Sequence, residues 1–184
     1  TALSDGSKEV RVAACAALSA VGDPQAVPAL LHVLGDSEAD VRRAAAEALG
    51  NLGDPQAVPA LSVWAHAGEH AARNALQTLG QPALDLTQAV AQVAAQGTWD
   101  ILIRALPNEK VREAVVGLGA PAVPALIQAL GDSDANVRRA AAEALGNLGD
   151  PQAVPALLHV LGDSEADVRR AAAEALGNLG DPQA

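Results

Sequence analysis

The feature that most constrains the fold of this chain is an internal repeat. Residues 41–57 recur, residue for residue, from Val137 and again from Val168, which lie 31 residues apart, and a looser copy begins at Val10. Self-similarity at a fixed spacing of this length is typical of proteins in which each copy is one structural unit that stacks on its neighbours.

Each copy has the pattern of two helices. The apolar residues of the first helix, helix A, fall on one stripe at helical spacing: Val41, Ala45, Ala48, Leu49 and Leu52. Ser37 is the expected N-cap, Asp40 completes an acidic variant of the capping box, and Gly53 is the expected C-cap.

The second helix, helix B, is expected to open at Asp54-Pro55, where aspartate caps and the missing proline N–H costs little. Val58 and Leu61 begin its apolar face. Pro59 lies early in this helix, so a bend or a 3₁₀ start is expected there.

A unit of two helices cannot bury its apolar stripe alone, so neighbouring units must share one continuous core. The sequence therefore predicts an all-α fold, an α-solenoid of stacked antiparallel helix pairs, as a single domain over residues 1–184. The repeats are regular in residues 1–61 and 119–184 and irregular in residues 62–118.

The irregular centre departs from the repeat in spacing. Its first step is 27 residues, which suggests a loop about four residues shorter around Ala67-Gly68. Residues 100–106 and 110–118 match a B helix and a short A helix. Between Gln81 and Gln96 the pattern allows either one long helix from Pro82 or a loop followed by a helix capped at Asp85.

The repeat has the pattern Val-Arg-Arg-x-x-x-Glu-Ala-Leu-Gly-x-Leu-Gly-Asp-Pro-x-Ala-Val-Pro-Ala-Leu. This pattern resembles the short HEAT-like repeats named after phycobilisome lyases, and the engineered consensus scaffolds derived from them. In those scaffolds the matching helix A lines the concave surface, and three outward positions are varied to select binders. Carried over position by position, the resemblance implies a protein-binding stripe made of Arg43, Glu47, Asn51, His70, Asn74, Thr78, Arg139, Glu143, Asn147, Arg170, Glu174 and Asn178. The alternative is a solvated helix face on which Arg and Glu pair at i,i+4 for about 0.2–0.5 kcal/mol each.

The charge of the chain narrows the classes of partner. A net charge of -10 disfavours nucleic acid and anionic membranes, since binding to phosphate needs clustered Lys and Arg. No apolar stretch approaches the length of a membrane span, and the N-terminus shows no charged region followed by an apolar run. Cys15 is the one cysteine and is expected to be a small packing residue. We expect a cytoplasmic protein.

No catalytic arrangement stands out, so we expect neither an enzyme nor a cofactor. His66, Glu69 and His70 match the H-x-x-E-H pattern of one class of zinc peptidases, which needs an uninterrupted helix, whereas Gly68 marks a helix junction. We therefore expect no metal there. Trp64 and Trp99 are expected to fill gaps in a core of small side chains.

The expected function is that of a scaffold that binds another protein. Two alternatives stay open. The first is a pigment-handling role of the phycobilin lyase kind, and the second is an engineered array without a natural partner, which the identity of residues 22–57 to residues 149–184 favours. Thr1-Ala2-Leu3 matches the end of a B helix and another begins at Ala184, so both ends are expected to expose apolar stripes that permit end-to-end self-association.

Overall fold

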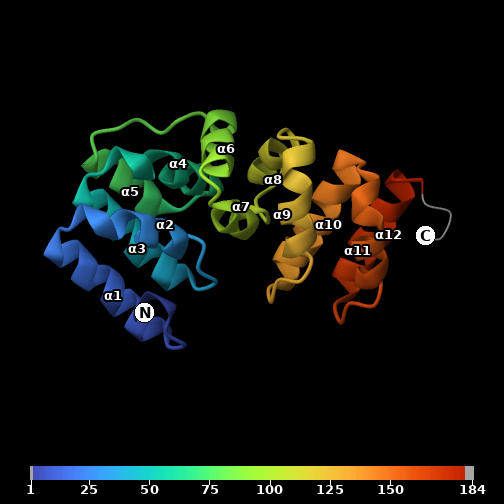
Figure 1. The fold of residues 1–184 in the computed structure, drawn as a ribbon, viewed down its shortest axis with the longest axis horizontal. Coiled ribbons are helices and arrows are strands. Elements are labelled where there is room, and N and C mark those ends of the chain that lie inside the picture. Colours follow the sequence, from blue (N-terminus) through green and yellow to red (C-terminus); the bar gives the residue numbers. More distant parts are fainter. Residues whose placement is uncertain (1, 181–184) are drawn as a thin grey trace. The chain divides into compact units, whose positions relative to one another are not determined.

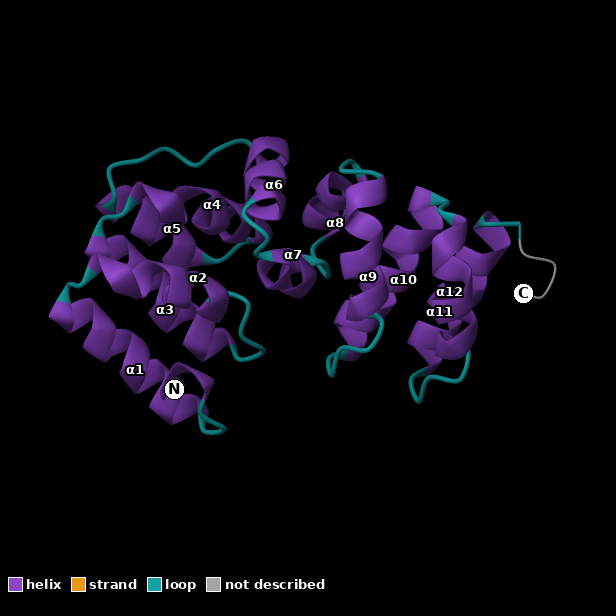
Figure 2. Ribbon diagram, viewed as in Figure 1, coloured by secondary structure: helices purple, strands orange, loops and turns teal. Residues whose placement is uncertain are grey.

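A computed structural model of the chain describes residues 2–180, and these form α-helices and short 3₁₀ turns, without any strand (Figure 1, Figure 2). The α-helices are α1 (Lys8–Val21), α2 (Val27–Val33), α3 (Ala39–Leu52), α4 (Val58–Ala67), α5 (His70–Thr78), α6 (Leu86–Ala95), α7 (Trp99–Ala105), α8 (Glu109–Val116), α9 (Val123–Ala129), α10 (Ala135–Leu148), α11 (Val154–Val160) and α12 (Ala166–Asn178). The 3₁₀ turns are η1 (Ala2–Ser4), η2 (Pro24–Ala26), η3 (Pro55–Ala57), η4 (Ala120–Ala122) and η5 (Pro151–Ala153). The all-α repeat fold expected from the sequence is confirmed.

The A helices follow the expected pattern except at their first residue. In α3 the residues Val41, Ala45, Ala48 and Leu49 are fully buried, and Gly53 ends the helix in the left-handed conformation. The N-cap is Glu38, without a side-chain hydrogen bond, so the expected cap at Ser37 is wrong. Asp36 lies two residues before this N-cap, and its carboxylate accepts the backbone N–H of Glu38 at 2.9 Å.

The B helices begin with a 3₁₀ turn, as the early proline predicts. Asp54 accepts the backbone N–H of Gln56, the turn η3 follows, and the α-helix starts only at Val58. The same arrangement recurs at Asp23 before η2 and at Asp150 before η5.

For residues 81–96 the structure shows the second of the two predicted arrangements, a loop followed by a helix. A loop follows α5, and α6 then begins after Asp85, whose carboxylate accepts the backbone N–H of Gln88 at 3.1 Å. The shortened junction also lies where the spacing placed it. Gly68, with a φ of 104°, is the C-cap of α4, and α5 begins two residues later.

The chain divides into two compact units, Thr1–Arg104 and Ala105–Ala184. In the first unit the A helices α1, α3 and α5 pack one on the next, and the B helices α2 and α4 pack against them (Figure 1). In the second unit α8, α10 and α12 form the A layer, with α9 and α11 packed against it.

Two A helices, α3 and α10, approach the next A helix closely at a glycine. A Cβ placed on Gly50 of α3 would lie 2.9 Å from the Cα of Ala75 in α5, and a Cβ on Gly146 of α10 would lie 2.7 Å from the Cα of Ala175 in α12. Both distances are shorter than a real side chain allows. The glycine therefore sets how near successive repeats can stack.

The expected B-helix residues Thr1 and Ala184 lie outside the described residues. Ala2 and Leu3, which follow Thr1, belong to the turn η1, which packs on α1. Within residues 2–180, no helix combines the length and the apolar character needed to cross a membrane.

Candidate interaction surface

The structure places the twelve stripe residues on the solvent side of four A helices. Ten of them are exposed, and two on α10, Arg139 and Glu143, are partly buried. We call the set on each helix its outer stripe: Arg43, Glu47 and Asn51 on α3; His70, Asn74 and Thr78 on α5; Arg139, Glu143 and Asn147 on α10; Arg170, Glu174 and Asn178 on α12.

The ion pairs within these stripes differ from the expected i,i+4 pattern. Arg43 bonds to Asp40 at 3.0 Å, three residues earlier, and Arg170 bonds to Asp167 at the same distance. Arg139, in contrast, forms the expected pair with Glu143 at 2.6 Å. The reason lies in the sequence, because α10 has Asn136 where the other two helices have aspartate.

The consequence is that Glu47 and Glu174 form no ion pair or hydrogen bond among the described residues. Glu143, by contrast, is also reached by Arg112 of α8 at 3.4 Å. Asn51 donates a hydrogen bond to Ser19 of α1 at 3.1 Å. The stripes on α3, α10 and α12 are thus alike in residue type but differ in which groups are free to meet a ligand.

The stripe on α5 carries no Arg or Glu. Its Thr78 hydroxyl donates to the backbone oxygen of Asn74 at 3.0 Å, and all three of its residues are exposed. On α1 the matching positions are Val12, Ala16 and Ala20, which are apolar. Within the first unit, the row of stripes therefore changes from apolar residues on α1, through Arg, Glu and Asn on α3, to His, Asn and Thr on α5.

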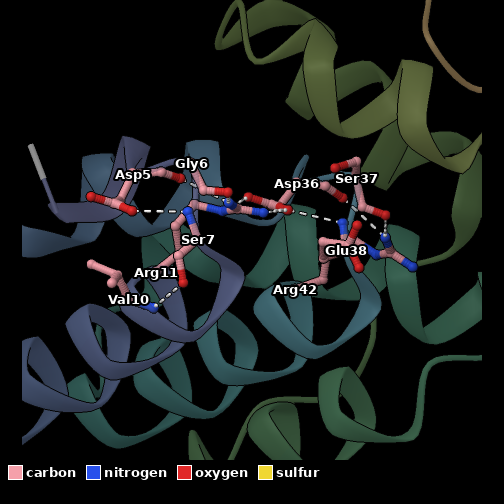
Figure 3. Close-up of polar contacts among 9 residues, drawn as sticks. All are labelled: Asp5, Gly6, Ser7, Val10, Arg11, Asp36, Ser37, Glu38 and Arg42. Carbon is pink, nitrogen blue, oxygen red and sulfur yellow. Dashed lines mark hydrogen bonds and ion pairs between the residues drawn. The ribbon is translucent and has the colours of Figure 1, made fainter.

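Sequence reasoning missed the role of the arginine that precedes each stripe. Arg11 of α1 binds Asp36 of the next repeat through Nε and Nη2, at 2.7 and 2.9 Å, and its Nη1 donates to the backbone oxygen of Asp5 (Figure 3). Arg138 binds Asp163 in the same two-bonded way at 2.8 and 3.0 Å. We call this arrangement the Arg–Asp clamp.

The clamp changes the titration of both partners in the second unit. Hydrogen bonds from Arg138 lower the pKa of the Asp163 carboxyl, and the backbone N–H of Glu165 adds to the effect. The same hydrogen bonds raise the pKa of Arg138. A signal for this contact was present in the sequence, because arginine and aspartate are 25 residues apart in both clamps.

Arg42 of α3 has a different environment because the shortened loop removes the aspartate of the next repeat. It pairs instead with Glu69 at 3.4 Å, and its guanidinium lies over the Trp64 ring, 4.9 Å from the ring centre. Trp64 is buried, as expected for a packing residue, whereas Trp99 is only partly buried.

The structure separates the residues of the zinc-peptidase pattern. His66 lies at the end of α4, and His70 opens α5, with the helix broken at Gly68 between them. The Nε2 of His66 lies 2.9 Å from the backbone oxygen of Leu84. Within residues 2–180 there is no group of three His, Cys, Asp or Glu side chains placed to hold a metal.

Cys15 is fully buried on α1, where burial raises the pKa of its thiol to about 11. A thiol in that state is a poor nucleophile. The packing role expected for it is therefore confirmed.

Comparison with known proteins gives a family and a set of similar structures. The family model for HEAT repeats matches residues 1–80 and 123–184. No curated protein sequence matches the chain. Among solved structures, human deoxyhypusine hydroxylase in complex with glycerol is 22% identical over 97% of this chain and 82% of its own, with a TM-score of 0.38.

Two non-natural proteins are similar to the same extent. An engineered protein is 20% identical over 97% of this chain and 94% of its own, with a TM-score of 0.38. A designed armadillo repeat protein is 17% identical over 96% of each chain, with a TM-score of 0.37.

Proposed function

The chain belongs to the HEAT-repeat family, and on this premise we propose that it is a non-catalytic scaffold that binds another protein through the outer stripes of its A helices. Stacked helix pairs present extended surfaces on which consecutive helices repeat the same positions. The proposal concerns each unit by itself, with α3 and α5 in the first and α10 and α12 in the second.

The observation that carries the proposal is the contrast between two neighbouring arginines. In α3 the side chain of Arg42 is 15% exposed and is held by loop carbonyls, Glu69 and Trp64, whereas that of Arg43 is 59% exposed and is paired locally. In α10 the corresponding values are 13% for Arg138 and 31% for Arg139. The second arginine contributes little to packing between repeats, so its side chain is available for a ligand.

The chemistry of the stripe favours a polar partner surface. Arginine, a carboxylate and an amide at i, i+4 and i+8 offer donors and acceptors along one helix, and Arg is among the residues that dominate the energetics of interfaces. The free carboxylates of Glu47 and Glu174 favour contact with basic side chains.

The test is a selection of binding peptides or small domains from a displayed random library, with the intact chain as the target. The dissociation constant of each binder is then measured for the double variant Arg43→Glu, Arg170→Glu. Because both side chains are exposed, the fold should persist and affinity should fall by about tenfold or more.

The matched control is the double variant Gln56→Glu, Gln152→Glu, which adds charge at the turns η3 and η5, after the A helices. It should leave binding unchanged. Binders that tolerate the arginine reversals, or that lose affinity equally with the control, would place the interaction elsewhere and refute the proposal.

A pigment-handling role, the alternative that follows from the resemblance to the phycobilisome-lyase type of repeat, rests on that resemblance alone. It requires the chain to alter the absorbance of a bilin. Titration of a bilin with the protein, in the presence and absence of an apo-phycobiliprotein, tests this role, and an unchanged visible spectrum would exclude it.

The engineered origin proposed as a third possibility rests on residues 22–57, which are identical to residues 149–184. An engineered array would have no natural partner, although its outer stripes would still accept selected binders. The selection described above therefore tests the binding surface whatever the origin of the chain.

A further inference from the structure

In α3, α10 and α12 one face is built to receive another repeat, and on α12 no described residue covers this face. The face consists of an arginine, an alanine and a glycine at i, i+4 and i+8, which we call the stacking stripe: Arg42, Ala46 and Gly50 on α3; Arg138, Ala142 and Gly146 on α10; Arg169, Ala173 and Gly177 on α12. Ala46 and Ala142 are buried, whereas Ala173 is exposed. Among the described residues, nothing lies within 4 Å of a Cβ placed on Gly177.

The difference between α3 and α12 comes from their surroundings, because residues 166–180 have the same sequence as residues 39–53. In α3, Gly50 receives Ala75 of α5, and in α10, Gly146 receives Ala175 of α12. The partner that fits Gly177 is therefore another A helix with an alanine at the same repeat position.

Helix α1 presents such an alanine on an exposed apolar face. Ala17 stands at the repeat position of Ala48, Ala144 and Ala175, all of which are buried, yet Ala17 is exposed. Val10 is 40% exposed, whereas the valines at its position in the other regular A helices are fully buried: Val41, Val137 and Val168. Among the described residues, none covers the side of α1 that corresponds to the buried side of α3, α10 and α12.

The charged groups at these two faces are also complementary. Asp5 occupies the position of Asp36 and Asp163, and its carboxylate accepts the backbone N–H of Ser7 at 2.8 Å, as Asp36 accepts that of Glu38 at 2.9 Å (Figure 3). The carboxylate is therefore held in the orientation that the clamp uses. Unlike Asp36, it has no arginine of a preceding repeat bound to it among the described residues.

Arg169 is the matching half of the clamp. Its Nη1 donates to the backbone oxygens of Asp163 and Ser164 at 2.8 and 2.9 Å, just as that of Arg138 donates to the loop before α10. Its Nε and Nη2, the atoms that bind aspartate in the other clamps, have no partner among the described residues. Arg169 is thus an anchored cation whose second binding edge is free.

We propose that two copies of this chain associate head to tail, with the stacking stripe of α12 in one copy packed against α1 of the next. In this contact Arg169 binds Asp5 of the other copy as Arg138 binds Asp163, and Gly177 receives Ala17. Each copy uses two different faces, so the interface is heterologous and association continues beyond a dimer.

The experiment is sedimentation velocity of the 184-residue chain over a concentration series. The wild-type chain should show a weight-average mass that rises with concentration and falls with added salt, because the clamp is an ion pair. Asp5→Arg alone and Arg169→Glu alone should each raise the dissociation constant by about tenfold or more, because like charges then oppose each other.

An equimolar mixture of the two single variants should recover the association. In one kind of contact, the unchanged Arg169 of the Asp5→Arg variant meets the unchanged Asp5 of the Arg169→Glu variant. In the other kind, the two substituted side chains meet, and they again carry opposite charges. Recovery in the mixture also shows that neither variant had merely unfolded, which circular dichroism of each checks independently.

Two further variants separate the clamp from non-specific effects. Gly177→Leu fills the open space that Ala17 would enter and should abolish association in the wild-type background. Glu109→Arg, with a like change of charge on the first turn of α8, should leave association unchanged. A wild-type chain that stays monomeric at ~1 mM, or variants Asp5→Arg and Arg169→Glu that associate like the wild type, would overturn the proposal.

Discussion

Two arginines that are neighbours in sequence have different roles in α10. The first, Arg138, points toward the next repeat and binds Asp163, while the second, Arg139, lies on the outer stripe. A bidentate arginine–carboxylate pair is among the stronger polar contacts, and here it connects residues in successive repeats. The identity of a residue therefore says less about its role than its angular position on the helix.

The Arg138–Asp163 clamp makes stability depend on pH. Because the folded pKa of Asp163 is lowered from its ordinary value of 3.8, the clamp contributes fully above that value and its contribution is lost as the pH falls through the lower folded pKa. Asp163→Asn should reduce the free energy of unfolding by about 1–2 kcal/mol near neutral pH. Urea titrations from pH 7 to about pH 2 should show this difference shrinking only below about pH 4.

The control for this prediction is the same substitution made without the arginine. In an Arg138→Ala background, Asp163→Asn should have a smaller effect at neutral pH, and its dependence on pH below about pH 4 should weaken. An effect of the same size in both backgrounds would mean that Asp163 stabilises the chain through the backbone N–H of Glu165 and not through the clamp.

Among the elements, the A helices were the easiest to predict because two signals agree. In α3 and α10 the apolar spacing and the glycine cap both fall where the repeat places them. The start of α3 was predicted one residue too early because Ser37 is a favoured capping residue, whereas the N-cap is Glu38, which makes no side-chain capping bond. Only the long-range bond from Arg11 shows that Asp36 is fixed in place.

The glycine at the helix–helix contact provides a matched pair of substitutions. Gly146→Ala should destabilise the chain by about 1–3 kcal/mol, because the new Cβ meets the backbone of Ala175 in α12. Gly177→Ala, at the same repeat position but in open space, should be neutral or stabilising by at most ~1 kcal/mol. Urea denaturation at a low protein concentration measures both; equal effects would contradict the packing role of Gly146.

Ten of the twelve outer-stripe residues are exposed, as the helical spacing predicts, but Arg139 alone among the stripe arginines forms the predicted i,i+4 pair. Helical spacing places Arg43, Glu47 and Asn51 on one face, which is a property of the backbone alone. The choice of Asp40 over Glu47 as the partner of Arg43 depends on competing carboxylates three and four residues away. The spacing of residues in the sequence does not determine which carboxylate binds the arginine, because the outcome depends on side-chain geometry.

At the scale of the whole molecule, the repeats are arranged in two compact units whose boundary falls inside the irregular segment. Both tryptophans, Trp64 and Trp99, belong to the first unit. Tryptophan fluorescence therefore reports on the first unit alone, whereas circular dichroism reports on the helices of both. The two signals together can separate the unfolding of the units.

We expect the fluorescence and circular-dichroism transitions in urea to differ, because repeat arrays unfold in parts when the contacts between parts are few. Gly146→Ala, which lies in the second unit, should move the dichroism transition to lower urea and leave the fluorescence midpoint unchanged. Coincident transitions that shift together in this variant would show that the two units unfold as one.

The Arg–Asp clamp has a consequence for a chain under mechanical tension. The carboxylate of Asp36 binds Arg11 with both oxygens, and one of these oxygens also holds the backbone N–H of Glu38 at the start of α3. A pull that separates α1 from α3 removes the arginine that orients this carboxylate. Rupture between two repeats would then loosen the first turn of the helix behind it, so that the array yields one repeat at a time from the loaded end.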